Sequence, residues 1–130
     1  MARAKKAKAM NLVNWFEIPV RDIDRAKAFY EAVFGVELTL NQMGPVEMAF
    51  FPMEQGLPGA NGSLVKAEFY IPSHFGTLVY FTVKDIEATL EQIGAKGGRT
   101  LMGKAGIGEY GFIAHFEDCE GNRVALHSPA

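Results

Sequence analysis

The stretch VRDIDRAKAFYEAVFG, residues 20–35, carries the start and stop signals of a complete helix. Asp22 is a typical N-cap residue, because its carboxylate can accept hydrogen bonds from the free amides of a first helical turn. Apolar side chains then recur at helical spacing, and Gly35 supplies the glycine with which helices commonly end. A β-branched and aromatic run, residues 12–20, precedes the helix and predicts a strand.

The same start recurs 63 residues later, where Val83-Lys84-Asp85-Ile86-Glu87 aligns with Val20-Arg21-Asp22-Ile23-Asp24. This second start predicts another strand and helix, at 77–83 and 86–94. Three strand-like runs follow each helix: 36–40, 46–51 and 63–69 after the first, and 99–102, 112–117 and 123–127 after the second. The repeat therefore predicts an α+β fold of two tandem βαβββ modules, which share one core because a unit of about 60 residues buries little alone.

We expect a first module at 11–70, a linker at 71–76 and a second module at 77–130. Residues 1–10 hold four basic side chains and predict a disordered leader or an added tail.

Composition narrows the class of protein. The 130 residues carry a net charge of −2, so a general nucleic-acid binder, which normally has a basic surplus, is disfavoured. A single cysteine, Cys119, excludes an internal disulfide framework and indicates a reducing compartment, the cytoplasm. No apolar run approaches the roughly 18 to 20 residues of a membrane span, so no membrane partner is expected.

Two motifs carry a family resemblance. The stretch 20–35 and the turn Asp118-Cys119-Glu120-Gly121-Asn122-Arg123-Val124 resemble the vicinal oxygen chelate superfamily, which holds glyoxalase I, extradiol dioxygenases and fosfomycin- and bleomycin-resistance proteins. The resemblance covers Asn11 to His127. It implies that the sheets of the two modules curl around one shared cleft and that the protein forms a homodimer.

The resemblance also implies four metal-ligand positions, on the first and last strands of each module, where the family's enzymes place His, Glu or Gln. Here these positions hold Trp15, Ser63, Leu78 and Ala125. Trp, Leu and Ala side chains cannot coordinate a divalent cation, and a lone Ser hydroxyl is a poor ligand. We therefore expect no metal site and no cofactor.

Strand side chains alternate with period two, so residues two positions from these share their face of the sheet. Polar groups are then expected in an otherwise apolar cleft, the usual composition of a small-molecule site. The predicted ligand-binding residues are Trp15, Glu17, Ser63, Leu78, Tyr80, Tyr110, His115, Arg123, Ala125 and His127.

Glu17 and His127 are the candidate acid and base if the protein is an enzyme. Burial beside Trp15 is expected to raise the pKa of Glu17 and suit it to general-base chemistry. The structural alternative is that Glu17 pairs with His127 or Arg123 and closes the cavity. A rebuilt metal triad of Glu17, His115 and His127 is a further, less favoured alternative.

Three other features are assigned structural roles. Gly106–Gly111 spells GxGxxG but precedes a strand, so it predicts a loop, with Tyr110 able to reach the cleft. His74 is expected to be exposed or in a dimer contact, and no basic neighbour activates Cys119.

The sequence thus predicts a protein that binds a small organic molecule, cationic or aromatic, without a metal. One alternative is a lyase or isomerase of the same superfamily that uses Glu17 and His127 or a rewired metal site. The other is a dimeric scaffold without a ligand.

Overall fold

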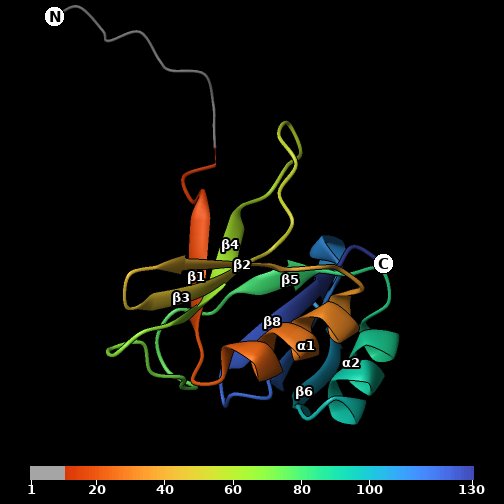
Figure 1. Cartoon of the computed structure of the whole chain (residues 1–130). Coiled ribbons are helices and arrows are strands. Elements are labelled where there is room, and N and C mark those ends of the chain that lie inside the picture. Colours follow the sequence, from red (N-terminus) through yellow and green to blue (C-terminus); the bar gives the residue numbers. More distant parts are fainter. Residues whose placement is uncertain (1–10) are drawn as a thin grey trace, which may run out of the picture.

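The computed structural model describes residues 11–130, so the predicted basic leader lies outside the described residues. Two four-stranded sheets follow one another along the chain (Figure 1). The first, in the order β1-β4-β3-β2, uses β1 (Trp15–Pro19), β2 (Thr39–Met43), β3 (Val46–Phe50) and β4 (Asn61–Lys66). The second, in the order β5-β8-β7-β6, uses β5 (Tyr80–Thr82), β6 (Arg99–Gly106), β7 (Phe112–Glu117) and β8 (Arg123–Ser128). With one helix after the first strand of each sheet, the predicted α+β class and tandem βαβββ pattern are confirmed.

Both helices begin at the predicted capping residues. Helix α1 (Ile23–Phe34) starts after Asp22, whose carboxylate accepts a hydrogen bond from the Arg25 amide at 3.0 Å. It ends at Gly35, whose φ of 63° is the left-handed conformation that glycine adopts without strain. Helix α2 (Ile86–Ala95) starts after Asp85 in the same way, with the Ala88 amide as donor. It continues one residue past the predicted end at Gly94.

Strand boundaries differ more from the prediction. Strand β2 begins at Thr39 rather than Val36, because the Leu38 amide donates to the Glu31 carboxylate at 2.8 Å and Leu38 packs into the core. Strand β5 is only three residues long, and β4 ends at Lys66 rather than Phe69. Strand β6 continues to Gly106 through register shifts. Propensity locates these strands, whereas tertiary contacts decide where pairing begins and ends.

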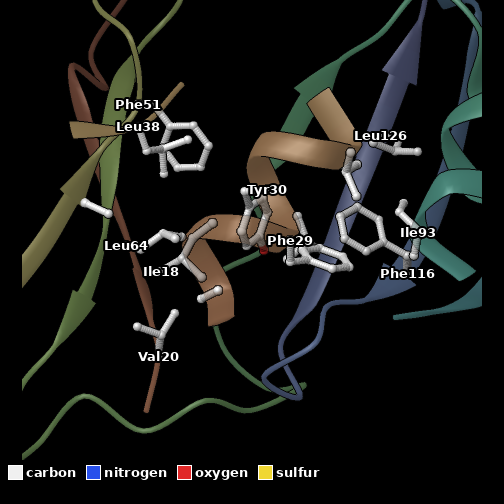
Figure 2. Close-up of a cluster of buried hydrophobic side chains, with 14 of the residues drawn as sticks. Ile18, Val20, Phe29, Tyr30, Leu38, Phe51, Leu64, Ile93, Phe116 and Leu126 are labelled. Atoms are coloured by element: carbon white, nitrogen blue, oxygen red, sulfur yellow. The ribbon is translucent and has the colours of Figure 1, made fainter. Parts of the chain in front are cut away.

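Helix α1 joins the two modules into one core. Figure 2 shows it between the first sheet and β8, with Tyr30 and Phe29 between the two groups of apolar side chains. The Tyr30 ring contacts Phe51 of the first module and Phe81 of the second, at centroid distances of 5.7 Å and 6.1 Å. Phe29 lies 6.5 Å from Phe116 in β7. One hydrophobic cluster therefore spans both modules.

The turn between β7 and β8 fastens the second module to the start of α1. The buried Asp118 carboxylate accepts hydrogen bonds from the Tyr30 hydroxyl at 2.6 Å and from the Asn122 amide at 2.9 Å. The Asn122 side chain in turn donates to the Pro19 carbonyl at 2.8 Å. Beside it, the Glu120 carboxylate pairs with Arg25 and raises the pKa of that guanidinium. The Asp-x-x-Gly-Asn motif thus holds the modules together.

Within residues 11–130, no helix is long and apolar enough to cross a membrane.

Candidate functional site

Each sheet has a back face, turned toward the core, and a front face. Back-face residues such as Ile18, Leu64, Phe116 and Leu126 belong to the cluster that also holds α1. The alternating side chains point the other way, because strand residues alternate between faces. The front face of the first sheet carries Trp15, Glu17, Phe50 and Ser63. That of the second sheet carries Tyr80, His115, Arg123, Ala125 and His127.

On the first sheet, an aromatic pair lies over Ser63. Ser63 is the register partner of both Glu17 in β1 and Phe50 in β3, and it is fully buried. The rings of Trp15 and Phe50 meet edge to face, with centroids 5.4 Å apart. The Ser63 hydroxyl oxygen has no hydrogen-bond partner among the described residues. The position that the family resemblance aligns with a metal ligand is therefore buried and carries an uncharged side chain.

Glu17 stands at the edge of this aromatic pair and is exposed. Its carboxylate accepts a hydrogen bond from the Tyr70 hydroxyl at 2.7 Å, and this bond raises the pKa of Tyr70. The burial expected of Glu17 is absent, and so is the predicted pairing with His127 or Arg123. Sequence reasoning missed Tyr70, because it lies between β4 and β5, outside the strands whose periodicity could have placed it.

On the second sheet, a hydrogen-bonded row crosses Ala125. Ala125 is the register partner of both Tyr80 and His115, and these two side chains meet with Tyr80 Oη 3.4 Å from His115 Nε2. Arg123 Nε donates to His115 Nδ1 at 2.9 Å. Since a guanidinium N–H can only donate, Nδ1 accepts and Nε2 carries the ring proton. Nε2 therefore donates to Tyr80, whose own hydroxyl proton remains available to a ligand.

Burial, together with the positive charge of Arg123, lowers the pKa of His115 and keeps its ring neutral at pH 7. Because the ring is neutral, His115 accepts from Arg123 at Nδ1 and donates to Tyr80 from Nε2. Tyr80 is 46% exposed, so the end of this row is open to solvent.

His127 and Tyr110 are brought together, as a ligand site would require, but they bind each other. His127 Nε2 donates to the Tyr110 carbonyl at 2.6 Å. The loop is held by Gly111, whose φ is 99° and where an added Cβ would stand 2.2 Å from the Ser128 carbonyl oxygen. The GxGxxG pattern begins at the end of β6 and contains a single 3-10 turn, η1 (Gly108–Tyr110), before β7, where a loop was predicted. Leu78 lies two residues before β5 and is half-buried.

The predicted set is divided between two sheets. Trp15, Glu17 and Ser63 lie on the first, the other seven residues lie on or beside the second, and no hydrogen bond or ion pair in the described part of the chain joins the groups. His74, expected to be exposed or in a dimer contact, instead pairs with Glu117 at 2.5 Å.

The described residues do not fit a metal ion. No group of three or more His, Cys, Asp or Glu side chains within residues 11–130 is placed to hold one. Glu17, His115 and His127, the alternative triad, each bind a different partner: Tyr70, the Tyr80 and Arg123 side chains, and the Tyr110 carbonyl.

Fold and sequence together define the class of protein. Residues 12–126 match the family described as the glyoxalase/bleomycin resistance protein/dioxygenase superfamily. A glyoxylase-like domain-containing protein of Didymella fabae is 30% identical over 118 residues, which cover 88% of this chain and 91% of that protein. The chain belongs to this superfamily.

Solved structures share the fold. TnmS3, an antibiotic-binding protein from Streptomyces sp. CB03234, superposes with a TM-score of 0.65 at 24% identity, covering 95% of this chain and 100% of that one. Glyoxalase I from Zea mays superposes with a TM-score of 0.67 at 19% identity, covering 88% of this chain and 45% of that one. At these identities the likeness concerns the fold alone.

Proposed function

We propose that the protein binds a small aromatic cation on the front face of the first sheet, without a metal ion. The observation that carries this proposal is Glu17, an exposed carboxylate beside the Trp15–Phe50 pair with no cationic partner in the described part of the chain. A cation gains from both the carboxylate and the faces of the rings. Binding of an antibiotic by TnmS3, which has the same fold, agrees with such a role.

The front face of the second sheet complements this site. The hydroxyl of Tyr80, oriented by His115 and Arg123, offers a hydrogen-bond donor to an oxygen of the ligand. No hydrogen bond or ion pair in the described part of the chain joins the two faces, and we propose that a homodimer brings the first face of one copy toward the second face of the other. Light scattering at micromolar concentration tests this arrangement, and a monomer would contradict it.

A lone half-buried cysteine suits a protein of the reducing cytoplasm.

The binding proposal is tested with the single tryptophan as reporter. Because Trp15 is the only tryptophan, its fluorescence reports directly on this face. Titration with benzyltrimethylammonium, in EDTA, is expected to change the fluorescence in a saturable way. Glu17→Gln is expected to weaken binding by roughly 5- to 30-fold, the equivalent of about 1 to 2 kcal/mol for a lost charge partner.

Glu37→Gln is the matched control, since Glu37 is an exposed glutamate outside both front faces. It is expected to bind like the parent chain. Equal affinities of the parent and the Glu17→Gln variant, or no fluorescence change in the parent, would overturn the proposal.

An acid–base enzyme is the less supported candidate. His127 donates to a backbone carbonyl and Glu17 accepts from Tyr70, so neither faces the other in one chain. The metal-dependent chemistry that the family resemblance implies would require ligands that Trp15, Leu78 and Ala125 cannot supply.

A further inference from the structure

A cavity lies between the two modules, and its lining includes the front-face residues Asn61 and Tyr80 but neither Glu17 nor Trp15. Its volume is about 710 Å³, within the usual range for small-molecule sites. Phe16 lines it from β1, Phe51 from the residue after β3, Phe34 from the end of α1 and Phe81 from β5. Phe81 stacks on Phe34 at 4.6 Å and meets Phe16 edge to face at 5.6 Å. The apolar part of the cavity is therefore a cluster of aromatic rings contributed by both modules.

The edge of β5 brings backbone hydrogen-bonding groups to this cavity. Val83 donates to the His127 carbonyl, and Val79 accepts from Ala125, both at 2.9 Å, so these alternate residues pair with β8. In a parallel pair the residues between them direct their N–H and C=O groups to the opposite edge. Thr82, which lines the cavity, lies at the free edge, since β5 has no other neighbouring strand among the described residues.

The charge at the rim favours an anion. Lys84 and Asp85 are the two charged residues among those that line the cavity. Asp85 is occupied as the N-cap of α2, where its carboxylate accepts the Ala88 amide at 3.0 Å. Lys84 has no ion-pair partner among residues 11–130. Lys84 is thus the cation at the rim of the cavity that no described carboxylate pairs with.

We propose that this inter-module cavity is a binding site for a flat aromatic anion, with the ring among Phe16, Phe34 and Phe81 and the anionic group toward Lys84. The ligand class is opposite in charge to that proposed for the Glu17 face. Tyr80 lines the cavity and also belongs to the second front face, so the tests use residues that belong to one site alone: Ala88 and Lys84 for the cavity, and Trp15 and Glu17 for the Glu17 face.

The probe is 1-anilinonaphthalene-8-sulfonate, a flat aromatic sulfonate whose fluorescence rises in apolar surroundings. We expect saturable binding of one probe per chain to the folded protein. Ala88 lines the cavity from the exposed side of α2, so Ala88→Phe fills space without removing a core contact. This variant is expected to weaken probe binding at least tenfold, since an occluded pocket cannot bury the ring.

Ala95→Phe is the matched control, because Ala95 is exposed on the same helix but does not line the cavity. It is expected to bind the probe like the parent chain. Lys84→Gln is expected to weaken binding about fivefold at low salt, and Lys96→Gln, an exposed position outside the cavity, is expected to leave it unchanged. Circular dichroism confirms that each variant is folded.

Each variant is also tested with the probe of the other site, so that an effect on one site can be told from an effect on both. Ala88→Phe is expected to keep the response of Trp15 to benzyltrimethylammonium, and Trp15→Phe is expected to keep probe binding. Probe affinity that is unchanged by Ala88→Phe, equal effects of Ala88→Phe and Ala95→Phe, or no probe binding by the parent chain would overturn the inter-module site. None of these results bears on the Glu17 face.

Discussion

Ser63, at the position that the family resemblance aligns with a metal ligand, carries a buried hydroxyl with no hydrogen-bond partner among the described residues. An unpaired buried hydroxyl loses its hydrogen bonds to water and gains none in the folded state. We expect Ser63→Ala to leave the free energy of unfolding within about 0.5 kcal/mol of the parent value, or to raise it. Urea denaturation measures this change.

The control for Ser63 is Ser128, which is equally buried but hydrogen-bonded. Its hydroxyl donates to the main-chain oxygen of Ala130, and the Lys84 carbonyl oxygen lies 3.4 Å from the same hydroxyl as an alternative acceptor. Ser128→Ala is expected to lower the free energy of unfolding by about 1 kcal/mol. A loss at Ser63 as large as at Ser128 would show that the Ser63 hydroxyl has a partner in solution.

Cys119 is expected to be unreactive. Burial and the nearby carboxylates of Asp118 and Glu120 raise the pKa of its thiol to about 12, so almost no thiolate exists at pH 8. Iodoacetamide should therefore label the folded protein far more slowly than the protein unfolded in urea. Equal labelling rates in the two states would contradict this environment.

Individual residues show how far the sequence alone reaches. Period two places Glu17 on the face of Trp15, and Arg123 and His127 on the face of Ala125, as predicted. It was taken to argue against His115, which the register nevertheless places beside Ala125. The partner of Glu17 could not be predicted, because Tyr70 follows β4 and its direction depends on the path of the linker. His115 and Arg123 lie on one face of the second sheet and share a hydrogen bond. Strand periodicity could have suggested this contact, but it was not predicted.

Among the elements, the β7–β8 turn links the two modules through hydrogen bonds from Tyr30 to Asp118 and from Asn122 to the Pro19 carbonyl. Tyr30→Phe removes the hydroxyl that donates to the buried Asp118 carboxylate while leaving the ring in the core. We expect a loss of about 1 to 2 kcal/mol in the free energy of unfolding, measured by urea denaturation.

Tyr70→Phe removes a comparable hydrogen bond at an exposed carboxylate and is the control. Its expected effect is below about 0.5 kcal/mol, since water replaces the lost donor. Equal losses in the two variants would mean that the Asp118 contact contributes no more than a surface bond.

Helices were easier to predict than strands for a local reason. The ends of α1 are set by Asp22 and Gly35, whose capping contacts lie within the helix's own turns. The start of β2 depends on Leu38, which is drawn toward Glu31 seven residues earlier and into the core. Such tertiary contacts leave no periodic signal in the sequence.

For the whole molecule, stability is expected to fall as the solution is acidified. The folded state lowers the pKa of His115 below 6.5 through burial and Arg123, so the unfolded chain binds this proton first. Arg99 and His74 hold the pKa of Glu117 below 4.5, and the Leu38 amide and Lys27 do the same for Glu31. Their stabilisation is present above these values and is lost as pH falls through the folded pKa values.

Urea denaturation at a series of pH values from 7.5 to about 4 measures this profile. Burial raises the pKa of Asp118 and acts in the opposite direction, but only as its carboxyl takes up a proton at low pH. His115→Asn should flatten the part of the profile near pH 6. A free energy of unfolding that rises on acidification over this range would contradict the assignment.

The arrangement of the modules was only partly predictable. The repeat and the need for a shared core predicted two joined modules, and α1 does join them. The sequence did not reveal that the candidate residues divide between two front faces without a contact in one chain. The positions of the two faces depend on the packing of Tyr30 and Phe29 between α1 and the second sheet. This packing is tertiary and leaves no pattern in the sequence.

Metal-independent binding at the Glu17 face can be followed through the indole N–H signal of Trp15 in a proton–nitrogen correlation spectrum. The chain has one tryptophan, so one signal reports on the Glu17 face. Addition of benzyltrimethylammonium in the presence of EDTA is expected to move this signal in a saturable way, and less so in Glu17→Gln. A signal that stays in place, or moves only after a divalent metal replaces EDTA, would contradict metal-independent binding at this face.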